Sequence, residues 1–175
     1  MRPVRYNVAA SLDGYIAGTN GEFDWIPDDP TVDFETLFAR IDTVLIGRRT
    51  YEVMRALDGP LPWAPSARVF LFSRTLRAAD HPDVTVVASD AAETVAALRA
   101  EPGEGEIWLF GGGELFATLL AAGLVDRVEV TVAPVLLGAG IPLLPTSIRT
   151  TMQLVHTQVY PSGMVALHYA VPGAR

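Results

Sequence analysis

Three short segments of the chain combine glycine, hydroxyl and arginine residues in patterns that suit phosphate. They are Gly47-Arg48-Arg49-Thr50, Ser73-Arg74-Thr75 and Gly111-Gly112-Gly113-Glu114. Each follows an apolar run that is typical of a β-strand, and the first and third lead into a helix. Free backbone N–H groups at a helix start attract anions, arginine adds positive charge, and glycine lets a backbone pass close to a pyrophosphate. Together the three segments predict a dinucleotide site.

Each segment also has a purely structural interpretation. Gly47 could simply make a turn with the arginines in solvent, the segment 73–75 could be a polar loop, and one glycine of the triplet could serve packing. Three consecutive glycines cost chain entropy, which favours a functional role for the triplet. The triplet is neither the Gly-x-Gly-x-x-Gly fingerprint nor a P-loop.

The segment 73–75 also indicates which cofactor would bind. A serine beside an arginine suits a monoester phosphate, such as the 2′-phosphate of NADPH. An acidic residue that binds a ribose 2′-hydroxyl would instead indicate NADH. The segment 73–75 contains no acidic residue, so NADPH is the predicted cofactor.

A long early loop follows the first strand, from Ala10-Ser11-Leu12-Asp13-Gly14 through Gly18 and on from Gly21 to Trp25. Its glycines would allow it to close over a bound substrate. It could also be a plain surface connection, although loops of this length inside compact domains are more often functional.

Composition excludes several other functions. The net charge of −7 and pI of about 4.8 make nucleic acid and anionic membranes poor partners. The chain has no cysteine, and its histidines, His81, His156 and His168, are scattered, so no metal site is predicted. No Gly-x-Ser-x-Gly elbow of a serine hydrolase occurs. No secretion signal or run of about 20 apolar residues is visible, so the expected compartment is the cytoplasm.

The elements that must position these residues alternate between strands and helices. Strands are predicted at residues 4–10, 43–46, 68–72, 84–88, 106–110 and 128–133, with a terminal hairpin of 152–160 and 164–171 that turns at 161–163. Helices are predicted at 33–40, at 48–57, after a cap at Ser89 or Asp90 with Glu93 in its first turn, and from the glycine triplet to near Gly123. This order predicts one α/β domain over residues 1–175, with a largely parallel sheet, helices on both faces and an antiparallel C-terminal hairpin. In such sheets ligands bind beyond the carboxyl ends of the strands.

In this order and spacing, four motifs resemble the dihydrofolate reductase superfamily over nearly the whole chain. They are Ala10-Ser11-Leu12-Asp13-Gly14, the segment Asp42 to Thr50, the turn Gly111 to Phe116, and Ala133-Pro134-Val135-Leu136-Leu137-Gly138-Ala139-Gly140. The similar branch is the reductase domain of bacterial riboflavin biosynthesis and its stand-alone relatives. The resemblance implies a three-layer fold with an eight-stranded mixed sheet, NADPH as cofactor, and a cis bond between Gly111 and Gly112.

The resemblance also assigns residues to the cofactor and the substrate. The cofactor residues are Ala10, Ile16, Ala17, Gly47, Arg48, Arg49, Thr50, Ser73, Arg74, Ser89, Phe110, Gly111, Gly112, Gly113, Glu114 and Leu115. The substrate residues are Asp13, Trp25, Asp33, Leu37 and Thr131, of which Asp13, Asp33 and Thr131 are the catalytic candidates. Glu35 is the second choice for the carboxylate that would hold a pterin, and Asp33 could instead be a simple helix cap.

The function that these residues and the resemblance imply is hydride transfer from NADPH to a C=N or C=O group of a pterin-like or ribosylaminopyrimidine-like small molecule. The alternatives are a nucleotide-binding module without turnover, a dihydrofolate reductase proper, and a flavin-dependent protein. The apolar segment 134–144 and the terminal hairpin could form a symmetric contact, which predicts a homodimer. Ordinary core packing in a monomer would also explain them.

Overall fold

A computed structural model describes residues 1–57, 61–146 and 148–173, with the exception of the side chain of Leu37. The predicted role of Leu37 in substrate binding therefore lies outside the described part of the chain. Within the described residues, no helix combines the length and the apolar composition that crossing a bilayer requires.

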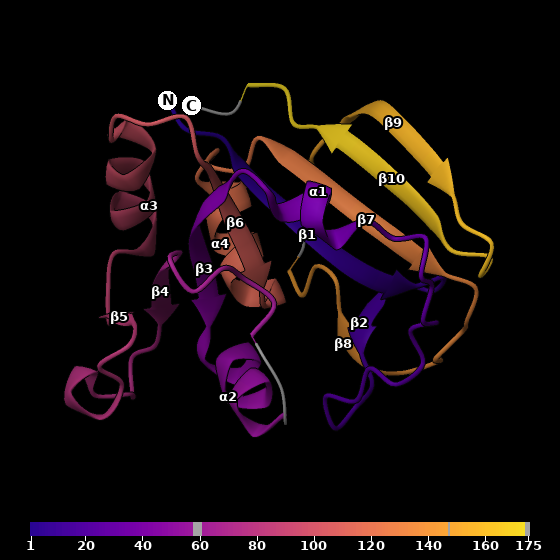
Figure 1. Cartoon of the computed structure of the whole chain (residues 1–175), viewed down its shortest axis with the longest axis horizontal. Helices are drawn as coiled ribbons and strands as arrows, with labels where there is room; N and C mark the ends of the chain where they lie inside the picture. The colour runs from indigo at the N-terminus through magenta and orange to yellow at the C-terminus, as the bar shows by residue number, and fades with distance from the viewer. Residues whose placement is uncertain (58–60, 147, 174–175) are drawn as a thin grey trace.

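An eight-stranded sheet forms the centre of the molecule (Figure 1). Its strands are β1 (Val4–Ser11), β3 (Ile41–Gly47), β4 (Arg68–Phe72), β5 (Thr85–Val87), β6 (Glu106–Gly111), β7 (Arg127–Ala133), β9 (Gln153–Val159) and β10 (Val165–Ala170). Their order is β5-β4-β3-β6-β1-β7-β10-β9, and every pair from β5 to β7 is parallel. β10 runs antiparallel to both β7 and β9. The predicted mostly parallel sheet with an antiparallel C-terminal hairpin is confirmed.

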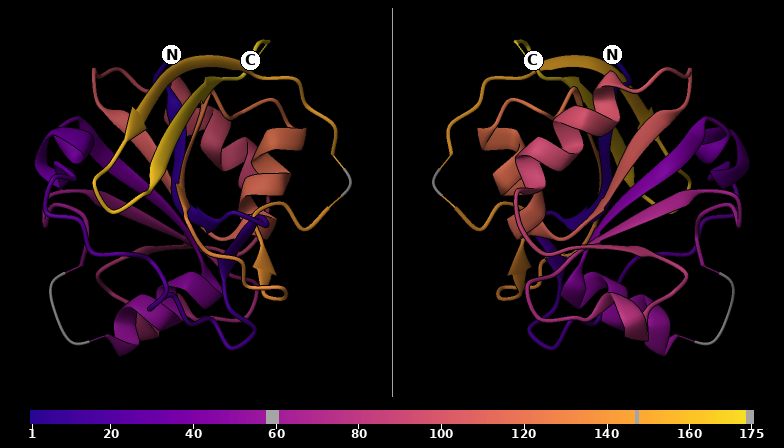
Figure 2. Two further views of the ribbon diagram at one scale, coloured as in Figure 1. Left: turned by 90° about the vertical axis from the view of Figure 1, so that its right-hand side faces the viewer. Right: turned by 90° about the vertical axis from the view of Figure 1, so that its left-hand side faces the viewer.

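Helices cover both faces of this sheet, which confirms the predicted three layers. They are α1 (Phe34–Phe38), α2 (Arg48–Ala56), α3 (Ala91–Ala100) and α4 (Gly113–Ala121). Figure 2 shows α3 and α4 on the same side of the sheet, where their leucines and valines join one hydrophobic cluster with β1 and β6. A second cluster on the other face contains Tyr51 of α2 and Trp108 of β6, with Phe38 of α1 packed against it.

Short elements account for most of the differences from the predicted elements. β2 (Tyr15–Ala17) and β8 (Ile141–Pro142) pair as a separate two-stranded sheet, and η1 (Ala78–Asp80) is a single 3-10 turn. These elements are too short to show a periodic pattern in sequence. The predicted helix 33–40 is wrong in its bounds, because residue 33 is its cap and Ile41 already belongs to β3. Asp90 occupies the cap position of α3, but its side chain makes no capping hydrogen bond.

Candidate functional site

The three predicted phosphate segments lie at one edge of the sheet. Gly47 ends β3 beside Phe72 of β4, and Ile46 pairs with Gly111 of β6. Because these strands are parallel and adjacent, their carboxyl ends meet at the same edge. The structure therefore brings together the segments around Gly47, Ser73 and Gly111, which lie far apart in sequence.

Two of these turns pack backbone against backbone. A Cβ atom at Gly47 would lie 3.3 Å from the backbone nitrogen of Gly112, and one at Gly112 would lie 3.1 Å from Oγ1 of Thr50. Side chains larger than hydrogen would push the turns apart. The peptide bond between Gly111 and Gly112 is cis, as the resemblance implies.

The helix starts at this edge lack side-chain caps. α2 begins after Gly47 and α4 after Gly112, and neither residue can supply a capping side chain. α3 begins after Asp90, whose carboxylate makes no capping bond. The first N–H groups of a helix need partners from outside the helix. Helix starts without a side-chain cap, beside glycine turns, fit the phosphates of a dinucleotide.

The arginines at this edge differ in how they are held. Arg48 contacts both carboxylate oxygens of Glu52 at 3.0 Å, one helical turn further on. The side chains of Arg49 and Arg74 are exposed to solvent. Such an exposed guanidinium can reach a phosphate without first breaking a buried ion pair.

Other predicted cofactor residues have structural tasks in the protein. The Oγ of Ser73 accepts hydrogen bonds from the N–H groups of Thr75 (3.2 Å) and Leu76 (3.0 Å), which fixes the turn after β4. A Cβ at Gly113 would lie 3.0 Å from the carbonyl oxygen of Pro142, so this glycine allows α4 to pack against β8. Their binding roles stay predictions.

The remaining predicted cofactor residues divide between the core and the surface. Ala10, Ile16, Phe110 and Leu115 belong to the hydrophobic clusters or pack against them, Ala17 lies in β2, and Ser89 and Glu114 are exposed.

Asp13 joins the early loop to the late apolar loop. Its carboxylate accepts hydrogen bonds from the Oγ of Ser11 (2.6 Å) and from the N–H groups of Leu137 (3.1 Å) and Gly138 (2.7 Å). The bond from the Ser11 hydroxyl, helped by the two backbone groups, lowers the pKa of Asp13. All of these bonds favour the charged carboxylate, which braces two loops against each other.

A pocket of about 330 Å³ lies between the segment 26–36 and the strands β1, β7, β9 and β10; we call it the sheet pocket. Asp33 and Thr131 both line it, as the resemblance implies, whereas Asp13 and Trp25 are not among its described lining residues. The indole nitrogen of Trp25 instead donates to the carbonyl oxygen of Glu22 at 3.1 Å. The structure thus brings together two of the three catalytic candidates.

The register of the sheet explains the polar floor of the sheet pocket. Asn7 of β1 lies opposite Glu129 of β7, and Glu129 lies opposite His168 of β10. Because paired residues share a face, these side chains form a row across the sheet. The amide nitrogen of Asn7 donates to Oε2 of Glu129 at 2.9 Å. Thr131 lies two residues after Glu129 on the same face.

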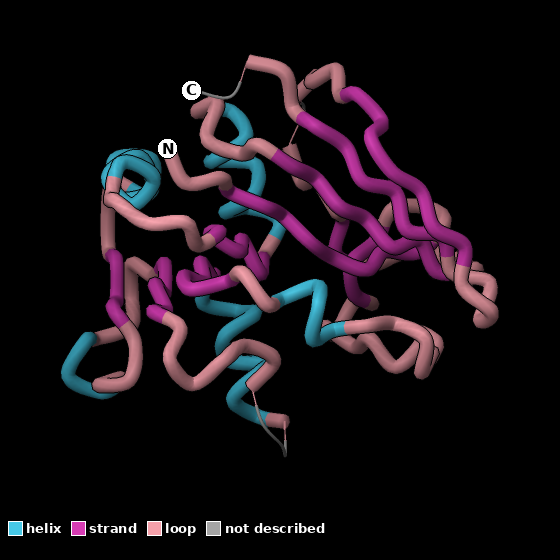
Figure 3. The backbone as a smooth tube through the Cα atoms, turned by 45° about the horizontal axis from the view of Figure 1, so that its top comes forward, coloured by secondary structure: helices cyan, strands magenta, loops and turns pink. Residues whose placement is uncertain are grey.

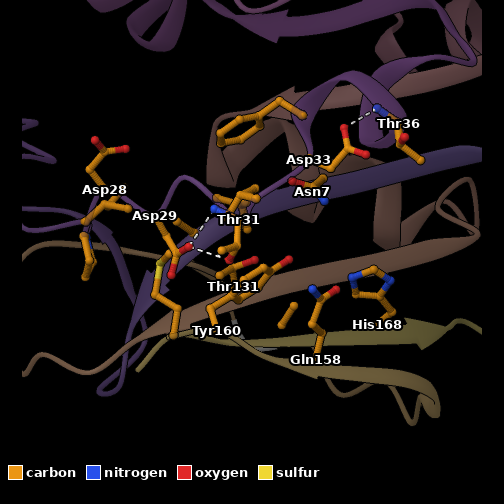
Figure 4. Close-up of a pocket in the computed structure, with 18 residues that line it drawn as sticks. Asn7, Asp28, Asp29, Thr31, Asp33, Thr36, Thr131, Gln158, Tyr160 and His168 are labelled. Carbon is orange, nitrogen blue, oxygen red and sulfur yellow. Dashed lines mark hydrogen bonds between the residues drawn. The ribbon is translucent and has the colours of Figure 1, made fainter. Parts of the chain in front are cut away.

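Sequence analysis missed several lining residues: Asn7, Gln158, Tyr160 and His168. Figure 4 shows Gln158 and His168 extending from the terminal hairpin toward the side of the pocket that holds Asn7 and Asp33. A signal existed for Asn7, since asparagine is depleted in β-strands and this one interrupts the apolar run from Tyr6 to Ala10. For the hairpin residues no signal existed, because the sequence predicts the hairpin but does not indicate that it pairs with β7.

Asp33 is both a helix cap and a pocket residue, the two alternatives that the sequence leaves open. Its carboxylate accepts a hydrogen bond from the N–H of Thr36 at 2.9 Å and so caps α1, while it also lines the sheet pocket. The hydrogen bonds from the backbone and side chain of Thr36 lower the pKa of Asp33. The candidate carboxylate is therefore ionised at neutral pH, and its position is fixed by the helix that it caps.

Asp29 fastens the loop that covers the sheet pocket. Its carboxylate accepts hydrogen bonds from the N–H (2.9 Å) and hydroxyl (2.5 Å) of Thr31, and from the N–H of Ser162 in the hairpin turn (2.9 Å). Figure 3 shows the loop before α1 approaching this turn, and Figure 4 shows the bonds to Thr31. The donors, with the Thr31 hydroxyl first, hold the pKa of Asp29 well below its usual range. Only 6% of Asp29 is exposed, so the link is shielded from water.

No group of three or more His, Asp and Glu side chains in the described residues is placed to hold a metal ion. The candidate site has two parts, the sheet pocket and the sheet edge where the three predicted phosphate segments meet; we call the second part the phosphate-binding edge after its predicted role.

Comparison with known proteins identifies the family of this chain. Residues 2–166 match the family model of the RibD C-terminal domain. The chain is 33% identical over 179 residues to YyaP of Bacillus subtilis (strain 168), with 96% of this chain and 94% of that protein covered. It is 30% identical over 150 residues to the riboflavin biosynthesis protein RibD of Mycobacterium tuberculosis (strain ATCC 25618 / H37Rv), covering 77% of this chain and 43% of that protein.

Solved structures share the fold. A Shewanella sp. PV-4 structure described as a riboflavin biosynthesis protein matches with a TM-score of 0.82 and 28% identity, covering 98% of this chain and 99% of that one. Dihydrofolate reductase of Enterococcus faecalis, complexed with NADP(H), matches with a TM-score of 0.71 and 20% identity over 97% of this chain and 96% of that one. A Thermotoga maritima deaminase and 5-amino-6-(5-phosphoribosylamino)uracil reductase matches with a TM-score of 0.68 and 21% identity over 97% of this chain and 57% of that one.

The hydrogen bonds of Asp29 predict a pH-dependent contribution to stability. The pKa of Asp29 in the folded chain is lower than its unfolded value of about 3.9, so the stabilisation is fully present above about pH 5 and is lost as the pH falls through the folded pKa. We expect Asp29→Asn to lower the free energy of unfolding at pH 7, with a difference from wild type that shrinks in acid. Urea unfolding between about pH 3 and 7 measures this.

Asp28→Asn is the matched control, because Asp28 is exposed and no hydrogen bond of its side chain is described. Its effect should be small at every pH. A difference for Asp29→Asn that does not change with pH would contradict the role of the ionised carboxylate.

Proposed function

Because the chain belongs to the RibD C-terminal domain family, we propose that it is an NADPH-dependent reductase of a pterin-like or ribosylaminopyrimidine-like small molecule. The observation that carries the proposal is the meeting of uncapped helix starts at one edge of the sheet, with the sheet pocket in the same chain. Similarity to a Thermotoga maritima reductase of a phosphoribosylaminopyrimidine supports the substrate class, and similarity to an NADP(H)-bound dihydrofolate reductase supports the cofactor.

Different residues at the phosphate-binding edge would bind different phosphate groups of the cofactor. The helix starts after Gly47 and Gly112 would hold the pyrophosphate through backbone N–H groups, with Arg48 and Arg49 adding charge. Arg74, exposed beyond β4, would bind the 2′-phosphate that distinguishes NADPH from NADH.

The sheet pocket would hold the group to be reduced. When bound, NADPH supplies a hydride to the carbon of a C=N or C=O bond and becomes NADP⁺, while the nitrogen or oxygen of that bond takes a proton from water. Thr131 and Asp33 would orient the heterocycle and such a water molecule. The loop fastened by Asp29 would exclude bulk solvent from the reacting atoms.

One observation favours a second candidate, a nucleotide-binding module without turnover. Both predicted catalytic carboxylates already have structural partners: Asp33 caps α1, and Asp13 holds the late loop. A module of this kind would keep the phosphate-binding edge and would not need a proton relay in the sheet pocket.

We also propose that the protein acts as a homodimer. β9 is the edge strand of the sheet, and all of its residues are exposed, including Val155 (57%) and Val159 (74%). Leu136 of the late loop is 69% exposed. An unpaired strand edge with apolar side chains is a surface that natural proteins usually cover.

The cofactor assignment predicts a selective loss of binding. Arg48→Ala with Arg74→Ala should weaken NADPH binding by about tenfold for each arginine, because each removes a charged phosphate contact. Arg74→Ala alone should leave NADH binding unchanged, since NADH lacks the 2′-phosphate. Calorimetry measures both. Arg40→Ala, an exposed arginine at the opposite edge, is the control. Unchanged NADPH affinity in the double variant would reject the assignment.

Turnover separates the reductase from the binding module. We expect the purified protein to oxidise NADPH, followed by absorbance, in the presence of at least one member of a panel of pterins, dihydrofolate and ribosylaminopyrimidines. NADPH binding without oxidation by any of them would favour the module.

The dimer proposal predicts a mass of two chains by light scattering. Val155→Asp should shift the protein to monomers, because it places a charge in the proposed interface. Thr85→Asp, on the edge strand β5 at the other end of the sheet, should have no such effect. A monomeric wild-type protein would contradict the proposal.

A further inference from the structure

The sheet pocket carries acidic side chains without a matching cation. Asp28, Asp29 and Asp33 line it, and none of its 18 described lining residues is an arginine. The chain contains no lysine, so all 13 of its Lys and Arg positions are arginine. Proteins that bind a phosphate group in a pocket normally place a cation or a free helix start against it. The helix start at this pocket, that of α1, is already capped by the carboxylate of Asp33.

Two of these carboxylates, those of Asp29 and Asp33, are held in the charged form by hydrogen bonds. Hydrogen bonds lower the pKa of Asp29 and of Asp33 below the usual range of an aspartate. Asp28 and Asp33 are exposed although they line the pocket, so they stand at its rim. In Figure 4 the Asp28 side chain lies at the outer end of the labelled group. A ligand group that leaves the pocket would pass these charges.

The floor of the sheet pocket does not compensate for them. Arg5 lies near two buried carboxylates, 3.3 Å from Oε2 of Glu106 and 3.5 Å from Oε2 of Glu129. Arg127 also contacts Glu106, at 3.4 Å. Two arginines therefore face two glutamates, and none of the four is among the described lining residues of the pocket.

The arginines of the site gather at its other part. Arg48, Arg49 and Arg74 all belong to the phosphate-binding edge, where uncapped helix starts add to the positive potential. The three arginines of the candidate site thus lie at the edge, whereas the described lining of the sheet pocket carries carboxylates and no arginine. An anionic group would be attracted to the edge and repelled at the rim of the sheet pocket.

The polar groups in the sheet pocket suit an uncharged heterocycle. Asn7, Thr131 and Gln158 each carry a group that both donates and accepts hydrogen bonds. Val8, Ile26, Phe34, Met164 and other apolar residues complete the lining. A volume of about 330 Å³ is near the lower end for ligand pockets. A ring system would fill it, and a sugar phosphate attached to that ring would reach the rim.

We infer that the sheet pocket selects pyrimidine-like or pterin-like compounds without a phosphate group, and that it discriminates against their phosphorylated forms. The inference rests on the proposed function for the identity of the pocket. The discriminating residues are Asp28 and Asp33, whose charges repel a phosphate dianion at the rim. The specificity would therefore come from repulsion between these carboxylates and the phosphate group, and not from an additional contact to the preferred ligand.

A matched pair of ligands tests the inference by binding. The probes are 5-amino-6-(5-phosphoribosylamino)uracil and the same compound without its phosphate, titrated by calorimetry into protein saturated with NADP⁺. We expect the compound without phosphate to bind about tenfold more tightly at low ionic strength. The ratio of the two dissociation constants should approach one near 0.5 M salt, because salt screens the charges at the rim. Equal or tighter binding of the phosphorylated compound, or binding of neither, would overturn the inference.

Two variants locate the source of the preference. Asp28→Lys should reduce or reverse it, because it replaces a rim carboxylate with a cation. Asp24→Lys makes the same change on an exposed residue of the same loop that does not line the pocket, and it should leave the preference unchanged. Equal effects of the two variants would show a general charge effect and overturn the role of the rim.

Turnover of the same pair separates this inference from the proposed function. If neither compound supports NADPH oxidation while the binding preference persists, the reductase proposal fails for this pair and the pocket selectivity stands. If NADPH is oxidised with a higher kcat/KM for the phosphorylated compound, the reductase proposal stands and the inference fails.

Discussion

The parallel pairing of the neighbouring strands from β4 to β7 is the constraint on which both parts of the site depend. Parallel direction brings the ends of the strands to one edge, so turns from distant parts of the sequence meet there. The register then decides which side chains share a face. A shift of one residue between β1 and β7 would turn Asn7 away from Glu129 and remove the polar floor of the sheet pocket.

Two carboxylates extend this frame into the loops. Asp13 accepts backbone hydrogen bonds from Leu137 and Gly138, and Asp29 accepts one from Ser162. Each therefore connects a loop near β1 with a segment that is more than 120 residues away in sequence. A charged acceptor strengthens such bonds, and a loop held at a defined point can border a ligand with a fixed shape. Of the two, Asp13 is a catalytic candidate in sequence and Asp29 is not, and both carboxylates hold loops in place.

The sequence predicts the fold well and the pocket only in part, for physical reasons. The strand 68–72 and the glycine triplet that starts α4 are visible because apolar runs and turn residues are local signals. The phosphate-binding edge follows from these elements and the rule that parallel strands end together. The sheet pocket needs the register of β10 and β9, which no local pattern specifies. Gln158 and His168 were therefore missed, and β2 and β8 owe their pairing to a long-range contact between loops.

The row of Asn7, Glu129 and His168 in the floor of the sheet pocket also fixes the polarity of the pocket. Burial lowers the pKa of His168, and the charges of Arg5 and Arg127 and the nearby His156 act in the same direction, while Glu129 opposes them. The imidazole is therefore neutral at pH 7 and can both donate and accept a hydrogen bond. Glu129 is held by Asn7 at 2.9 Å and lies 3.5 Å from Arg5, so its charge is engaged within the floor. The floor residues that line the pocket, Asn7, Thr131 and His168, therefore present neutral polar groups, whereas Asp28 and Asp33 at the rim are acidic.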